Sequence, residues 1–195
     1  MSDAKRTGRP RSETSRAAVL DSTWSLLKTT TLKDLSIEAI AREAGVGKTT
    51  IYRWWPSKIA VAVDAFLAQV ETVLPFPKTE TVAEAITKQM QQLIQIFRGE
   101  VGQIVAQIIA EGQSDPEALQ SFRERFLDLR RDVARQVMIK GIESGEFDPD
   151  LDPDLAMDIL YGPIYYRLLV QHLPLDEAFM AALPQRAIIC LRFNR

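Results

Sequence analysis

The chain has 195 residues, of which 46% are hydrophobic and 26% charged. This length suffices for one large domain or for two smaller ones, and the composition excludes a disulfide-stapled miniprotein, a fibrous protein and an extensively disordered chain. With a single cysteine, Cys190, and a single histidine, His172, the sequence predicts no internal disulfide, no metal site and no cofactor.

Membrane segments and export signals are not expected. No stretch approaches the roughly 18 uninterrupted apolar residues of a spanning helix, and the first residues are polar and basic. We therefore expect a cytoplasmic protein without membrane contact.

Charge is unevenly distributed along the chain. Residues 1–58 carry 11 Lys or Arg against 6 Asp or Glu, a net charge of +5, whereas residues 59–195 carry 13 against 20, a net charge of −7. This difference in net charge favours a polyanion as the partner of residues 1–58, because Lys and Arg bind phosphates with release of counterions. Ordinary solvated surface charge is the alternative explanation.

Hydrophobic spacing is helical along almost the whole chain, which predicts an all-α fold. In the first part, helices are expected over residues 13–28 with Ser12 as cap, over 37–44 between Ser36 and Gly45, from Gly47 to before Pro56, and from Ser57 to before Pro75. In the second part they are expected over residues 82–97, 101–110, 116–144, 154–172 and 176–191.

Residues 36–55 are typical of a helix-turn-helix. Two short helices flank a turn with Gly45 and Gly47; Val46 fills the corner, and Ile51 and Trp55 face the first helix of the chain. The second helix then turns its polar side outward, as a helix that reads the DNA major groove requires.

Each candidate DNA contact has a chemical reason. Lys48 and Lys58 are expected on phosphates, Thr50 and Arg53 on bases, with phosphate the alternative for Arg53. Trp55 is expected in the core and Trp54 at the surface, where an exposed indole favours a partner. The full set of predicted contacts comprises Ser36, Gly47, Lys48, Thr49, Thr50, Tyr52 (ring in the core, hydroxyl on phosphate), Arg53, Trp54, Lys58, Arg9 and Arg11.

The sequence A-I-A-R-E-A-G-V-G-K-T-T-I-Y-R-W-W of residues 39–55, followed by P-S-K, resembles the TetR family of transcriptional regulators. The resemblance implies a three-helix DNA-binding head, a larger helical C-terminal domain for dimerisation and effector binding, and repression relieved by the effector. We accordingly assign residues 1–12 to a flexible basic arm, 13–73 to the DNA-binding domain and 74–195 to the C-terminal domain. The family often has Ser in place of Gly47 and Gly in place of Thr49, so the operator sequence is not predicted.

The leading arm contains Gly8-Arg9-Pro10, which is similar to the core of an AT-hook. An extended backbone of this kind places arginines, here Arg9 and Arg11, in an A·T-rich minor groove. A solubilising tail is the alternative.

A protein that binds two DNA half-sites is expected to be a homodimer. The stretch 154–172 is apolar around much of its circumference, and with the end of the last helix it is the predicted interface, packing as a four-helix bundle across a two-fold axis. The interface residues predicted are Leu160, Ile164, Leu168, Ile188 and Leu191. A helix wholly buried within one subunit is the alternative.

An effector pocket is predicted from apolar and phenolic side chains of the later helices. Its predicted lining is Phe97, Ile104, Phe122, Phe126, Met138, Tyr161, Tyr165 and Tyr166, with plain core packing as the alternative. The excess of acidic groups favours a small apolar or cationic effector.

The sequence thus predicts a dimeric, effector-released repressor that binds double-stranded operator DNA. An activator without an effector and a helical module that binds protein are alternatives. A helical enzyme is disfavoured, because no Ser/His/Asp set and no phosphate loop is recognisable.

Overall fold

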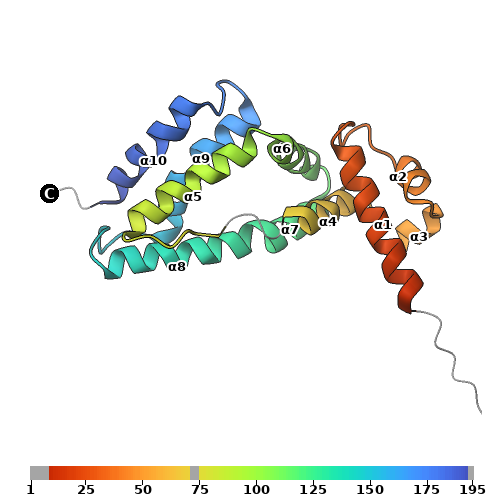
Figure 1. Cartoon of the computed structure of the whole chain (residues 1–195), viewed down its shortest axis with the longest axis horizontal. Coiled ribbons are helices and arrows are strands. Elements are labelled where there is room, and N and C mark those ends of the chain that lie inside the picture. Colours follow the sequence, from red (N-terminus) through yellow and green to blue (C-terminus); the bar gives the residue numbers. More distant parts are fainter. Residues whose placement is uncertain (1–8, 71–74, 193–195) are drawn as a thin grey trace, which may run out of the picture. The chain divides into compact units, whose positions relative to one another are not determined.

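The computed structural model describes residues 9–70 and 75–192, with side chains described from Glu13 onward. Within these residues every regular element is a helix and no strand occurs, which confirms the all-α prediction (Figure 1). No single described helix is long and apolar enough to cross a membrane; α5 and α6 pass that test only as a pair, bent by 82° at their junction.

The chain forms two compact units. The first comprises Met1–Glu71 and Gln107–Phe122, and the second comprises Thr72–Ala106 and Arg123–Arg195. The first change of unit falls beside the predicted boundary at 73–74, but residues 107–122 belong to the first unit, whereas the sequence placed them in the C-terminal domain. Contacts distant in sequence cause this difference: the Phe122 ring lies 5.8 Å from that of Phe66, and the Ser57 hydroxyl donates to Asp115 at 2.7 Å.

The first unit is built on α1 (Arg9–Leu27), which packs against α2 (Ile37–Ala44) and α4 (Lys58–Val70). Because α1 begins at Arg9, Ser12 lies inside the helix and is not its cap. Its buried face also differs from the expected one: Val19, Leu20, Thr23 and Leu27 are buried and Ala17 is exposed. Thr23 joins the core because its hydroxyl donates to the Val19 carbonyl at 2.7 Å. The short helices α3 (Lys48–Tyr52) and α7 (Pro116–Phe122) complete the unit, with the end of α6 (Glu100–Gly112).

The second unit contains α5 (Val82–Phe97), the start of α6, α8 (Leu129–Glu143), α9 (Pro153–Val170) and α10 (Glu177–Leu191). Figure 1 shows α5 beside α10, and α5 also packs against α8 and α9. Residues 82–97 form a helix as predicted, and the Glu146 carboxylate caps its start by accepting from the N–H groups of Val82 and Ala83 at 2.9 and 3.0 Å.

The predicted helix over 116–144 is divided in the structure. Residues Arg123–Asp128 form a π-helical segment between α7 and α8. A π-helix accommodates residues through i→i+5 bonds and shifts the faces of the helices on either side, which a simple 3.6-residue pattern does not predict. In α9 the helix ends before Gln171, whose φ of 54° is left-handed and whose N–H donates to the Arg167 carbonyl. Residues 171 and 172 therefore lie outside the helix predicted to include them.

Candidate nucleic-acid interface

The helix-turn-helix begins with a well-capped α2. The Ser36 hydroxyl accepts from the Ala39 N–H at 3.1 Å, and Gly45 ends the helix with a φ of 64°. Both features satisfy backbone groups that a helix end leaves without partners. The chain consequently turns sharply into Gly47, the residue before α3.

Two buried residues fix α3 and the turn that follows it. Ile51 is fully buried and Trp55 is 4% exposed, and the N–H groups of Trp54 and Trp55 both donate to the Ile51 carbonyl. Lys48, Thr49, Tyr52 and Arg53 are exposed on the other side. A polar, partly cationic surface backed by apolar anchors is what a helix needs to enter a DNA groove.

An ion pair bridges α2 and α3. The Lys48 ammonium lies 2.9 Å from the Glu38 carboxylate, and both side chains are exposed. The hydrogen bond from Lys48 lowers the pKa of Glu38, and the same bond raises the pKa of Lys48. Both groups are therefore charged at neutral pH, and Lys48 has an anionic partner within the protein.

Asp64 on α4 connects α1 and the turn after α3 within the first unit. Its Oδ2 accepts from the Trp55 indole N–H at 2.8 Å and from the Arg16 guanidinium at 2.9 Å. Asp64 is only 9% exposed, and the Arg16 guanidinium also lies 5.7 Å from the Trp55 ring centroid. A buried carboxylate with charged and neutral donors is well satisfied and orients the groups that bind it.

Comparisons with known proteins agree with this geometry. Residues 19–64 match the family described as bacterial regulatory proteins, tetR family, and residues 76–187 match the tetracyclin repressor-like C-terminal domain. The HTH-type transcriptional regulator YdeS of Bacillus subtilis is 33% identical over 180 residues, which are 92% of this chain and 91% of YdeS. The chain belongs to the TetR family. Members of this family are DNA-binding transcriptional regulators and not enzymes.

Solved structures share this fold, and one of them is described as a TetR family member. The TetR family transcription regulator SCO0332 is 35% identical, with a TM-score of 0.74 over 90% of this chain and 97% of that chain. The regulator FadR from Bacillus subtilis, solved in complex with stearoyl-CoA, is 18% identical, with a TM-score of 0.72 over 88% of this chain and 97% of that chain. The flavonoid-responsive regulator FrrA is 22% identical, with a TM-score of 0.67 over 91% and 94%.

The structure of this TetR-family chain places most predicted DNA contacts on one short segment. It corrects the expected exposure of Tyr52 and Trp54, and it gives Lys58 contacts within the protein. Tyr52 is 55% exposed, so its ring is not in the core. Trp54 is half-buried rather than exposed, because it packs edge-on against Trp55 at 5.5 Å between centroids. The Lys58 ammonium donates to the carbonyls of Lys33 and Leu35 at 2.5 and 3.0 Å, which gives it a structural role in closing the loop before α2.

The predicted minor-groove arm is not tested. Residues 1–8 and the side chains of Arg9 and Arg11 lie outside the described part of the structure. The backbone of residues 9–12 is helical, so these four residues belong to α1 and not to the predicted arm.

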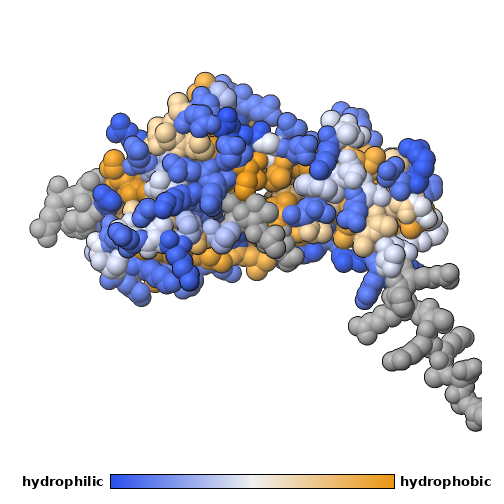
Figure 2. All heavy atoms as spheres, in the orientation of Figure 1, coloured by the Kyte–Doolittle hydropathy of each residue, from blue (hydrophilic) through white to orange (hydrophobic). Residues whose placement is uncertain are grey.

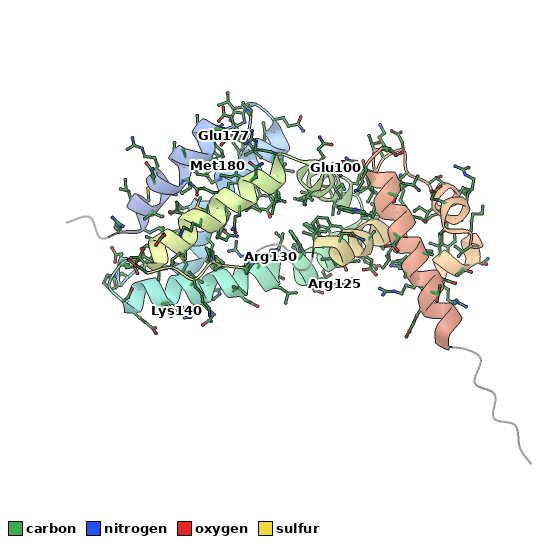
Figure 3. The ribbon with its side chains drawn as sticks, viewed as in Figure 1. Glu100, Arg125, Arg130, Lys140, Glu177 and Met180 are labelled. Carbon is green, nitrogen blue, oxygen red and sulfur yellow. The ribbon has the colours of Figure 1, made fainter. Side chains whose placement is uncertain are left out.

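The predicted effector residues do not all lie together in the structure. Phe97, Ile104, Phe126 and Met138 are buried in the second unit, whereas Phe122 packs in the first unit and Tyr166 is 57% exposed beside His172. Tyr161 donates to the Gln89 side chain at 2.8 Å, and Tyr165 packs edge-on against Phe97. Burial raises the pKa of both phenols, that of Tyr165 to about 12, although the charge of Arg130 lowers it in part. Figure 3 shows Arg130 where the π-helical segment meets α8.

The predicted interface residues are interior residues of the subunit. Leu160, Ile164, Leu168, Ile188 and Leu191 are all buried by the chain's own helices. Other apolar side chains remain exposed on the same two helices, and Figure 2 shows apolar surface over α10. They are Leu155, Tyr166, Leu169 and Val170 on α9 and Ile189 on α10. The five predicted residues therefore cannot be surface residues of the described chain, and the sequence did not distinguish them from the exposed ones because α9 is apolar on both sides.

Two residues that contact the candidate DNA-binding segment were not predicted from the sequence. Asp64 stands nine positions from Trp55 on another helix, in a stretch that reads simply as apolar and helical, so no local pattern marks it. Glu38 is recognisable only as an acid in the first turn of α2, and its pairing with Lys48 depends on the angle between α2 and α3.

Proposed function

We propose that the chain is a homodimeric repressor whose α3 enters the DNA major groove and which a small-molecule effector releases from its operator. The observation that carries the proposal is the exposed set Lys48, Thr49, Tyr52 and Arg53, backed by the buried Ile51 and Trp55. A protein that binds operator DNA is expected in the cytoplasm, and we include this location in the proposal.

The dimer is supported by the outer face of α9. Leu155, Tyr166 and Leu169 are exposed at helical spacing, and Gly162 lies among them with no atom within 4 Å of the position that a Cβ would take. Exposed apolar residues arranged on one face favour a protein interface, and a glycine among them lets another helix approach closely. A second copy of α9 offers the same complementary face, as a two-fold axis requires.

The effector is supported by the interior of the second unit. Tyr161, Gln89 and Tyr165 place polar groups among apolar side chains, a combination suited to an apolar molecule with a few polar atoms. FadR, with its stearoyl-CoA, and the flavonoid-responsive FrrA share the fold. Because the groups around Tyr161 and Tyr165 are mainly apolar, we propose an apolar effector rather than a cationic one.

DNA binding is tested by selecting ligands for the full chain from a randomised DNA duplex pool and titrating the enriched duplex at several salt concentrations. We expect an enriched palindromic sequence and a steep loss of affinity with salt. Replacing Lys48 and Arg53 together with Ala should abolish binding without loss of helicity. Lys140→Ala, which removes an exposed cation from α8, is the matched control and should bind normally. A shallow salt dependence without sequence enrichment would favour the protein-binding module.

Release is tested with stearoyl-CoA and with a flavonoid, added separately to the complex with the enriched duplex. We expect one of them to raise the melting temperature of the free protein and to dissociate the DNA. Both effects should be weaker for the Tyr161→Phe variant. Transcription from a promoter that carries the enriched sequence then separates repression from activation.

A further inference from the structure

Four side chains follow one another from the interior of the first unit to its surface. The Asp64 carboxylate binds the Trp55 indole, the Trp55 ring packs edge-on against the Trp54 ring, and the Arg53 guanidinium lies over Trp54, 5.0 Å from its centroid. Asp64 and Trp55 are buried, Trp54 is half-buried and Arg53 is exposed. The exposed guanidinium is thus connected to the core through two aromatic rings.

We propose that Trp54 is a positioning residue that holds Arg53 in place to read a base pair in the major groove. The inference rests on the proposed contact of α3 with DNA and goes further, because it assigns sequence discrimination to one side chain and its support to another. An arginine that reads the O6 and N7 acceptors of guanine must present two N–H groups in a fixed plane. A flexible arginine meets a phosphate easily, but it discriminates between bases only when its position is restricted.

The charges around α3 suggest different roles for Lys48 and Arg53. Lys48 is paired with Glu38, whereas Arg53 makes no ion pair within the described part of the chain. Attraction between a cation and an aromatic face restricts the guanidinium without using its N–H groups as an ion pair does. Arg53 is therefore both placed and available for acceptors on the DNA.

The test compares base preferences of full-length variants selected on the same randomised duplex pool. The variants are Arg53→Ala, Trp54→Leu, which removes the ring but keeps apolar cover over Trp55, and Trp54→Phe, which keeps a ring face. Trp24→Leu is the matched control, since Trp24 on α1 also carries a cation, the Lys28 ammonium, at 5.6 Å from its ring. Thermal melting of each variant shows whether the fold is retained.

We expect Arg53→Ala to reduce the preference for one base pair in each half-site by at least about fivefold, the lower limit for a lost bidentate contact. Trp54→Leu should reduce the preference at the same base pair by about three- to fivefold, as expected for an exposed cation–ring contact. Trp54→Phe should restore most of it, Trp24→Leu should leave it unchanged, and Arg53→Ala with Trp54→Leu should be no worse than Arg53→Ala alone at that position.

Two results would overturn the inference while leaving DNA binding intact. One is an Arg53→Ala variant that loses affinity evenly for all sequences, which would mark Arg53 as a phosphate contact. The other is a Trp54→Leu variant with unchanged base preferences beside an Arg53→Ala variant that has lost them. A wild-type protein that enriches no sequence would instead reject the proposed function itself.

Discussion

Glu38 places a negative charge next to Lys48 on the surface proposed to meet DNA, with 2.9 Å between the charged atoms. A carboxylate at this position repels phosphates and competes for the Lys48 ammonium. Because Lys48 lowers the pKa of Glu38, the carboxylate remains ionised throughout the neutral range. Its repulsion of phosphates should therefore not vary between pH 6 and 8.

Glu38→Gln should therefore strengthen DNA binding, by about two- to fivefold at low salt and less at high salt, since exposed charges are screened. Fluorescence anisotropy with a labelled duplex measures the change. Glu84→Gln is the matched control, because Glu84 forms the same kind of exposed pair with Lys88, at 2.6 Å, on α5 of the second unit. Equal effects of the two substitutions would contradict a local role for Glu38.

Trp55 offers a second test at this scale, because its indole N–H is bound to the buried Asp64. Trp55→Phe keeps an aromatic ring but removes the donor, and should lower the free energy of unfolding by about 1–2 kcal/mol. Trp24→Phe, whose indole donates no hydrogen bond to the described residues, should cost less. Urea titration followed by circular dichroism measures both, and a smaller loss for Trp55→Phe than for Trp24→Phe would be evidence against the role of Asp64.

At the scale of elements, the turn between α2 and α3 depends on Gly45. Its φ of 64° is unfavourable for residues with a Cβ, although a Cβ there would meet no atom within 4 Å. Gly45→Ala should thus cost about 1 kcal/mol of stability through the backbone alone. Gly99→Ala is the control, because its φ is not positive and its nearest contact would be an ordinary 3.6 Å. Chemical denaturation of the two variants should separate them; equal stabilities would contradict the argument.

An ion network connects α8 and α9. Arg135 binds both oxygens of Asp154 at 2.5 and 2.6 Å, and Arg131 bridges Asp154 and Asp158 at 3.1 and 2.9 Å. The hydrogen bonds from Arg135 and then Arg131 lower the pKa of Asp154, against some desolvation. A carboxylate whose pKa is lower in the folded state stabilises the fold above its unfolded pKa and loses that effect as the pH falls through the folded value.

Asp154→Asn should accordingly lower the melting temperature at pH 7 by a few degrees at most, as expected for a partly exposed network. The difference from wild type should shrink as the pH falls below the ordinary Asp pKa of 3.8. Melting curves at pH 7 and pH 3 test this expectation. A difference of the same size at both values would mean that charge is not the cause.

At the scale of the whole molecule, the proposed dimer interface on the outer face of α9 predicts a link between assembly and DNA binding. Leu169 is 42% exposed on this face, and Leu129 on α8 is 57% exposed elsewhere. Leu169→Lys should dissociate the proposed dimer, because it brings two like charges into an apolar interface, and it should also weaken binding to a palindromic duplex. Leu129→Lys should do neither. Sedimentation equilibrium measures the mass of each variant, and a Leu169→Lys variant that remains dimeric would move the interface away from α9.

Local signals in the sequence determined where most helices begin and end. Ser36 and Gly45 bound α2 as predicted, and residues 82–97 form a helix with the predicted bounds. Such features depend on residues a few positions apart, and their hydrogen bonds form within a single turn. The helix-turn-helix, and through it the family, were recognisable for the same reason.

Tertiary structure alone decided which sides of the helices became interior and which groups met. In α9, Leu160 and Leu169 are equally apolar, and only packing against α5, α8 and α10 buried the first and left the second exposed. Likewise, Asp64 binds Trp55 and Arg16 because α1 and α4 pack together, and Glu38 meets Lys48 because the turn brings α2 to α3. Periodicity specifies a face relative to its own helix axis, whereas burial and pairing depend on neighbours that are distant in sequence.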